Sequence, residues 1–328
     1  MTVKKIILIA LFVVGMVALA LVPTLVESDS IINLLISTFV YAMLASSWNI
    51  LGGFTGQISL GHAAFFGAGA LATRMLWTTG FPLVPSLLAG GAAALLLAMI
   101  VGGTAFRLRG VYFTIGTLAL GQILYVTVGN VLPKIAQLPP LEIATYDLTY
   151  RYYVILAVGV FSIATANALV KSRFGLGMMA VRENEDAAES LGVNAFSHKM
   201  LALAFSAFLA GLAGGAFAYY HVGYYFNYPF SPPWSLDVMT MAYIGGVRTI
   251  IGPLVGSVFY VVLKEWLVLN VGGYHLIVFG VLFILVVLFL PGGLVELWER
   301  IREAIARRVN RKESQLTPLE LREDRLAE

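Results

Sequence analysis

The chain has 328 residues, of which 59% are hydrophobic and 12% charged, and its mean hydropathy is +0.86. A soluble domain carries about a quarter charged residues, so this composition is that of a polytopic membrane protein. The net charge of +3 is distributed among loops, which argues against a nucleic-acid partner. Cysteine is absent and the four histidines show no metal-ligand spacing, so we expect no metal site, no catalytic residue and no cofactor in this chain.

The first apolar run has two interpretations. Lys4 and Lys5 precede the run 6–22, as in a secretory signal, and Ala18-Leu19-Ala20 resembles a cleavage site. We favour an uncleaved first spanning helix, because many further spans follow it.

Apolar runs of sufficient length recur along most of the chain. A helix needs about 20 residues to cross the hydrocarbon core. The expected spans are 5–25, 31–51, 60–79, 83–106, 111–132, 151–171, 199–221, 236–250, 252–270 and 274–291. We therefore predict an all-α fold with about ten transmembrane helices. The span 236–250 is short, and its alternative is half of a re-entrant hairpin.

Lysine and arginine lie mostly on one side of these predicted spans. With the N-terminus inside, most of the 21 fall in inside loops or in the C-terminal tail, whereas the longest outside loop holds Lys134 and Arg151. The positive-inside rule then predicts that both termini are cytoplasmic.

A glycine-rich segment, Gly52–His62 (GGFTGQISLGH), joins the second and third spans. Its four glycines and several polar side chains are unsuited to a continuous helix facing lipid. Irregular backbone at membrane depth is tolerated only where it is buried in protein or lines a wet cavity. We predict a translocation pathway here, with a tight packing turn as the alternative. The predicted lining residues are Gly53, Thr55, Gln57, Ser59 and His62.

A second glycine-rich segment, Gly245–Pro253 (GGVRTIIGP), lies between the eighth and ninth spans. Interrupted helices in both halves of a transporter indicate a central pathway, so two of the predicted helices are expected to be broken by glycine. Gly245, Gly246 and Thr249 are predicted to line that pathway. Arg248 is either a topology charge at an inner turn or a contact for an anionic substrate group.

The charged segment 171–199 separates two apolar runs. Acidic residues at 183–186 suit the first turn of a helix, and Gly192 would end it. Such a short helix fits a groove on a cytoplasmic partner, with a solvated connection as the alternative. The predicted contact residues are Arg182, Glu183, Asp186, Ala187, Ala188, Leu191 and Gly192.

The sequence divides into a transmembrane domain, 1–293, and a cytoplasmic tail, 294–328. In the tail, apolar residues recur at helical spacing from Leu294 to Val309, with arginine and glutamate on the other face. We expect a helix on the inner membrane surface, followed by a polar, disordered end.

Several of these motifs resemble those of branched-chain amino-acid permeases. Asp186-Ala187-Ala188-x-x-x-Gly192 is similar to the E-A-A-x-x-x-G signature of ATP-binding-cassette importer permeases, with aspartate in place of glutamate. Four further blocks resemble the branched-chain family, and the second of them resembles its M-type subunit. They are Trp48–Arg74 (WNILGGFTGQISLGHAAFFGAGALATR), Arg107–Gln122 (RLRGVYFTIGTLALGQ), Gly245–Gly256 (GGVRTIIGPLVG) and His275–Gly293.

This resemblance implies the permease subunit of an ATP-driven importer of branched-chain, hydrophobic amino acids in a bacterial or archaeal inner membrane. The implied partners are a second, H-type permease subunit, two ATP-binding subunits that hold ATP and magnesium, and a periplasmic substrate-binding protein. The segment 182–192 would be the coupling helix seated on an ATP-binding subunit. Related permeases carry urea or short amides, which stay alternative substrates.

Two features of the sequence agree with an external energy source. The chain has no G-x-x-x-x-G-K-[ST] phosphate loop, so it does not hydrolyse ATP alone. A proton-coupled carrier normally needs ionisable relays inside the bundle. The few candidates at membrane depth fall mostly near the ends of predicted spans: Arg74, Asp237, Arg248, Lys264 and Glu265. An ATP-independent secondary carrier and a channel or scaffold stay as alternative classes.

Overall fold

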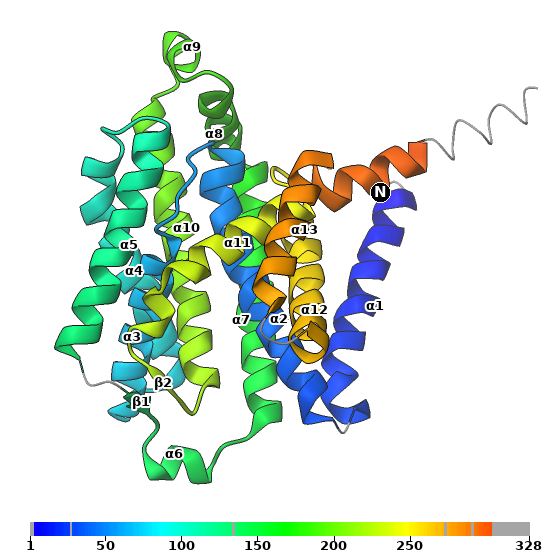
Figure 1. Ribbon diagram of the computed structural model, residues 1–328. Coiled ribbons are helices and arrows are strands. Elements are labelled where there is room, and N and C mark those ends of the chain that lie inside the picture. Colours follow the sequence, from blue (N-terminus) through cyan, green and yellow to red (C-terminus); the bar gives the residue numbers. More distant parts are fainter. Residues whose placement is uncertain (1–2, 27, 133–134, 272–273, 290–291, 304–328) are drawn as a thin grey trace, which may run out of the picture.

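The computed structural model describes residues 3–26, 28–132, 135–271, 274–289 and 292–303, with the backbone alone over 3–12 and at 271, 275, 276, 279, 282 and 287. The chain forms a helical bundle with one small two-stranded sheet (Figure 1). The main helices are α1 (Val3–Leu25), α2 (Asp29–Asn49), α3 (His62–Thr78), α4 (Leu83–Ala105), α5 (Val111–Val131), α7 (Leu148–Lys171), α8 (Arg173–Glu183), α10 (Ala195–Tyr220), α11 (Pro232–Gly245), α12 (Gly252–Val271) and α13 (His275–Phe289). The shorter elements are the π-helical turn η1 (Ile50–Phe54), β1 (Ile135–Gln137), α6 (Pro140–Ala144), α9 (Glu185–Ser190), β2 (Gly223–Tyr225) and the 3-10 turn η2 (Tyr228–Phe230).

Six helices of the described residues are long and apolar enough to cross a membrane. They are Asp29–Phe54, Leu83–Ala105, Val111–Val131, Leu148–Lys171, Ala195–Tyr220 and Gly252–Asn270. The predicted all-α, polytopic membrane fold is confirmed, and the number of about ten crossings stays a prediction.

The helix at the expected eighth span is too short to cross by itself. α11 has 14 residues, which gives a length of about 21 Å at 1.5 Å per residue, against a hydrocarbon core of about 30 Å. It packs closely on α12, because a Cβ added at Gly245 would lie 1.8 Å from the carbonyl oxygen of Gly252. α11 and α12 therefore form a tight hairpin around the second glycine-rich segment.

α10 is the most buried of the six long helices and packs against α3 and α4. Its small residues allow close approach: a Cβ at Gly69 of α3 would lie 2.1 Å from the Gly211 oxygen, and one at Gly214 would lie 1.9 Å from the Phe66 oxygen. Lipid gives helices no hydrophobic reason to associate, so such close backbone packing supplies much of the stabilisation.

The two ends of the bundle differ in character. The sheet pairs β1 with β2 in antiparallel register, Ile135 opposite Tyr225, and it lies with α6 at one end. α8 and α9 lie at the opposite end, toward which the N-terminal end of α1 also points (Figure 1). That arrangement is compatible with an N-terminus on the side of the charged segment; the assignment of this side to the cytoplasm stays a prediction.

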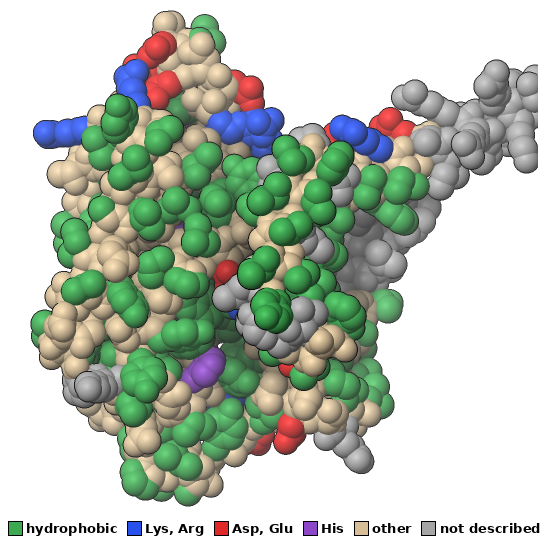
Figure 2. Space-filling view, viewed as in Figure 1, with side chains coloured by type: hydrophobic (Ala, Val, Ile, Leu, Met, Phe, Trp, Pro, Cys, Tyr) green, Lys and Arg blue, Asp and Glu red, His purple; other side chains and the backbone are tan. Residues whose placement is uncertain are grey.

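Apolar side chains cover much of the lateral surface that Figure 2 shows, whereas charged side chains gather at the end formed by α8 and α9. Large apolar residues on several helices are strongly exposed, among them Ile100, Val131 and Leu269. An apolar surface of this extent would be unfavourable in water and suits contact with lipid. Helical backbone continues over 293–303, where Glu296 and Arg300 form an ion pair; the rest of the predicted tail, including Ile305 and Val309, lies outside the described residues.

Candidate functional site

The first glycine-rich segment departs from regular helix where α2 ends. The chain continues through the π-helical turn η1 and then runs irregularly until α3 begins at His62. Some of its polar groups have partners within the protein: Thr55 Oγ1 donates to the Ile50 oxygen (2.9 Å), and Trp48 Nε1 donates to the Ser59 oxygen (2.8 Å). His62 Nδ1 is buried without a hydrogen-bond partner among the described residues. Thr55, Ser59 and Gly61 of the irregular backbone are buried in protein, which is one of the two conditions under which membrane depth tolerates it, whereas Gly56 and Ile58 are exposed.

The side chains predicted to line a pathway here differ in exposure. Thr55, Ser59 and His62 are fully buried, and His62 Nε2 lies 2.9 Å from Ser47 Oγ. Gln57 is half-buried. In this conformation the first three serve internal hydrogen bonding, and their contact with a solute stays a prediction.

The second glycine-rich segment is a tight turn between α11 and α12. Gly246 has φ +125° and Arg248 has φ +78°. Residues other than glycine, asparagine and aspartate rarely adopt positive φ angles. Thr249 Oγ1 donates to the Gly246 oxygen (2.9 Å) and accepts from the Gly252 nitrogen (2.8 Å). Thr249 therefore closes the turn that begins α12.

Asn49 joins the two glycine-rich segments. Its Nδ2 donates to the Thr249 oxygen (2.8 Å), and its Oδ1 accepts from the Arg248 nitrogen (3.2 Å). Gly53 fits beside this amide only because it lacks a side chain, since a Cβ there would lie 1.9 Å from Asn49 Oδ1. The sequence indicated both segments but not the role of Asn49. The one local signal for Asn49 is that an amide side chain stands at the end of an apolar span, shortly before a glycine pair.

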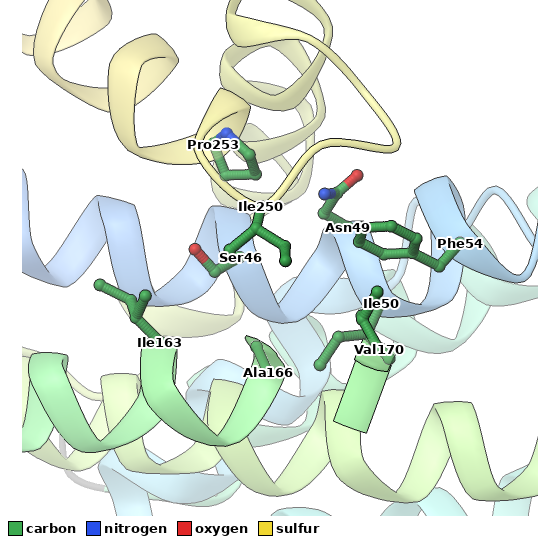
Figure 3. Close-up of a pocket in the computed structure, with 9 residues that line it drawn as sticks. All are labelled: Ser46, Asn49, Ile50, Phe54, Ile163, Ala166, Val170, Ile250 and Pro253. Atoms are coloured by element: carbon green, nitrogen blue, oxygen red, sulfur yellow. The ribbon is translucent and has the colours of Figure 1, made fainter. Parts of the chain in front are cut away.

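Little space remains where the two segments meet. Figure 3 shows the cavity at this junction, whose volume is about 10 Å³. A volume of that size holds about one water molecule, so an amino acid does not pass through the junction in this conformation. The lining residues are Ser46, Asn49, Ile50, Phe54, Ile163, Ala166, Val170, Ile250 and Pro253.

Arg182 connects the charged segment to this junction. It belongs to α8, and its Nη1 donates to the carbonyl oxygen of Gly53 (3.0 Å), while Nη2 pairs with Glu183. Its aliphatic stem passes close to Gly56, where an added Cβ would lie 2.5 Å from Arg182 Cγ. The sequence placed Arg182 among the contacts for a cytoplasmic partner, but in this structure its guanidinium faces the glycine-rich segment.

The predicted short helix is present as α9, and hydrogen bonds cap it at each end. Asn184 Oδ1 accepts from the Ala187 nitrogen (3.0 Å) as an N-cap. At the other end, the Gly192 nitrogen donates to the Glu189 oxygen (2.9 Å) and the Val193 nitrogen to the Ala188 oxygen (3.0 Å). This is a Schellman motif, and it requires the left-handed φ of +87° found at Gly192.

The two faces of α9 have different environments. Ala188, one of the predicted contact residues, is buried against Val181 and Ala195 and does not lie on the outward face. Asp186, Ala187 and Leu191 point outward, and Leu191 is 86% exposed. The outward face thus combines a small residue, an acid and one large apolar side chain.

Two ion pairs connect α9 to its neighbours. Lys199 of α10 is buried and its Nζ lies 2.5 Å from Glu185 Oε2. The pair between Arg109 and Asp186 (3.7 Å) is largely exposed and contributes little. Through Glu185 and Ala188, α9 is fixed to α10 and α8. Among the described residues, no group of three or more His, Cys, Asp or Glu side chains could hold a metal ion.

Comparison with known proteins identifies the family. Residues 30–287 match the family described as "Branched-chain amino acid transport system / permease component". The chain belongs to this family. The permease is 26% identical, over 318 residues, to the high-affinity branched-chain amino acid transport system permease protein LivM of Escherichia coli (strain K12). That alignment covers 87% of this chain and 74% of the relative, and LivM of Salmonella typhimurium (strain LT2) gives the same values.

No solved structure matches this permease. The family match contains both glycine-rich segments and the charged segment, and it confirms the resemblance that the sequence motifs indicated. The chain is therefore a multi-pass membrane permease, a kind of protein that is not an enzyme.

Proposed function

We propose that this chain is the permease subunit of an ATP-binding-cassette importer that moves branched-chain, hydrophobic amino acids across the inner membrane. Its membership of the family and the names of both LivM relatives, which are branched-chain amino acid permeases, support this substrate class. This subunit and a second, H-type permease form the pathway, two ATP-binding subunits supply the energy, and a periplasmic protein delivers the substrate.

The observation that carries the mechanism is the hydrogen bond from Arg182 to the Gly53 carbonyl. An ATP-binding subunit seated on the outward face of α9 displaces α8 together with α9, because Ala188 packs against Val181 of α8. Arg182 transmits that displacement to Gly53. Asn49 transmits it further to the second glycine-rich segment, so ATP binding and hydrolysis open and close the junction.

The test is a reconstituted complex of both permeases, the ATP-binding subunits and the periplasmic protein. We expect ATP-dependent uptake of leucine, isoleucine and valine, which unlabelled urea does not compete. Arg182→Met removes a charge-assisted hydrogen bond worth about 1.5–3 kcal/mol, so uptake per ATP hydrolysed should fall about tenfold or more. The matched control is Arg109→Met, which removes an exposed ion pair and should change this ratio less than about twofold.

Two results would overturn the proposal. One is accumulation of leucine by the isolated subunit without ATP, which would indicate a secondary carrier. The other is competition by urea but not by valine, which would assign the subunit to the amide permeases. Equal uptake per ATP in Arg182→Met and Arg109→Met would leave the substrate class intact and remove Arg182 from the coupling route.

A further inference from the structure

A second, much larger cavity lies between α2 and α12. Its volume is about 410 Å³, within the range of small-molecule sites in proteins. It is lined by Ser30, Asn33, Leu34, Ser37 and Tyr41 of α2 and by Val261, Lys264, Glu265 and Val268 of α12. None of these residues lines the closed junction of the glycine-rich segments.

The α2 wall of the cavity contains a polar stripe on a mostly apolar helix. Ser30, Asn33, Ser37 and Tyr41 recur at intervals of three or four residues, which places them on one helix face. The Asn33 side chain is held by Tyr220, whose hydroxyl donates to Asn33 Oδ1 (2.7 Å). Polar stripes within a spanning helix face protein or a water-filled cavity rather than lipid, and commonly mark a substrate path.

An ion pair adjoins this cavity: Lys264 lines it, and Asp237 is not a lining residue but is the ion-pair partner of Lys264. Lys264 Nζ is 3.6 Å from Asp237 Oδ2 of α11, which is longer than a direct hydrogen bond. Lys264 lies about 18 Å along α12 from its first residue and about 9 Å from Asn270 at 1.5 Å per residue, within the spanning segment Gly252–Asn270. The expectation that most such charges fall near the ends of spans stays a prediction.

The surroundings of Lys264 keep it available to a ligand. The Lys264 and Asp237 side chains are 38% and 23% exposed, and the Lys264 ammonium lies 5.8 Å and 5.4 Å from the rings of Tyr41 and Tyr260. Charges inside a membrane are costly and mark function by default. A loose, partly open pair can exchange its partner for a ligand group, whereas a tight buried pair cannot.

We propose that this cavity binds an α-amino acid, with Lys264 facing the carboxylate and Asp237 the ammonium group. This inference rests on the proposed function and names its substrate site. A free amino acid carries both charges, so it replaces the Lys264–Asp237 contact by two ion pairs without adding net charge at membrane depth. Leu34, Val261 and Val268 supply the apolar wall for an aliphatic side chain, and Glu265 lies at an exposed position of the same cavity.

The test uses the full complex and three ligands of equal carbon skeleton. In detergent, without the periplasmic protein, leucine should raise the melting temperature of the complex. Leucinamide, which lacks the carboxylate, and 4-methylpentanoate, which lacks the ammonium, should raise it much less. Equal shifts with all three would overturn the assignment of the two charges.

Two double variants separate a substrate site from a structural ion pair. Neutral Asp237→Asn with Lys264→Met should lower leucine uptake about tenfold or more, as expected for loss of at least one charged contact. The charge-exchanged pair Asp237→Lys with Lys264→Asp keeps an ion pair but reverses its direction, and should also transport poorly. Wild-type uptake in the exchanged variant, with loss in the neutral one, would make the pair structural and overturn the proposal.

The matched control neutralises the exposed pair Glu296–Arg300 in the same way, as Glu296→Gln with Arg300→Met, and should leave uptake unchanged. Failure of the wild-type complex to take up leucine would refute the proposed function itself. Normal uptake by the wild type and by the neutral Asp237–Lys264 variant would refute only the site.

Discussion

The crossing of α3 and α10 gives the sharpest prediction for stability. Gly214→Ala places a methyl group 1.9 Å from the Phe66 oxygen and 2.9 Å from the Ala70 nitrogen, where ordinary contacts begin at 3.4 Å. Both neighbours are backbone atoms and cannot rotate away, so the helices must separate. Overpacking of this kind costs about 1–3 kcal/mol, and we expect the upper half of that range because the Gly69–Gly211 contact opens as well.

The assay is the unfolding midpoint of the detergent-solubilised complex as denaturant is added. The control is Gly103→Ala in α4, where nothing lies within 4 Å of the added methyl group. Since alanine suits a helix better than glycine by about 0.5–1 kcal/mol, this variant should be neutral or slightly more stable. Equal midpoints for Gly214→Ala and Gly103→Ala would show that the close approach of α3 and α10 does not limit stability.

Three further predictions concern the route from α9 to the junction. Gly192→Val strains the left-handed end of α9 by about 1–2 kcal/mol and should reduce co-purification of the ATP-binding subunits, whereas Gly192→Asn, which tolerates that conformation, should retain it; full retention with valine would refute the docking role. Leu191→Asp should change the free energy of unfolding by less than about 0.5 kcal/mol, because Leu191 is 86% exposed. It should nevertheless lower co-purification of the ATP-binding subunits. Asn49→Leu leaves the Arg248 nitrogen and the Thr249 oxygen without their partner, at about 1–3 kcal/mol each, and should speed amide hydrogen exchange in 246–252; unchanged exchange would contradict the joining role of Asn49.

The helices and the ends of α9 could be predicted from the sequence, because they depend on interactions between neighbouring residues. Apolar length predicted the long helices, and acidic residues followed by Gly192 predicted α9, because caps and left-handed glycines act over a single turn. The inward packing of Ala188 was not predictable, since it depends on Val181 and Ala195 being brought together by the turn between their helices.

Contacts between distant parts of the chain escaped prediction for the same reason. Asn49 and Thr249 are 200 residues apart, and nothing near either one indicates the other. Lys264 and Asp237 pair across α12 and α11, and neither residue carries a local signal that indicates the other. A glycine-rich segment indicates that two backbones approach closely, but it does not show which other part of the chain packs against it.

Asn49 binds the second glycine-rich segment through both ends of its amide, and this limits how the permease moves. Its Nδ2 donates to the Thr249 oxygen and its Oδ1 accepts from the Arg248 nitrogen, which belong to neighbouring residues of the same turn. Asn49 itself is the last residue of α2 and directly precedes the turn η1 of the first segment. The end of α2 and the turn between α11 and α12 are therefore tethered by two adjacent hydrogen bonds, which favours a concerted displacement of both over independent motion of either.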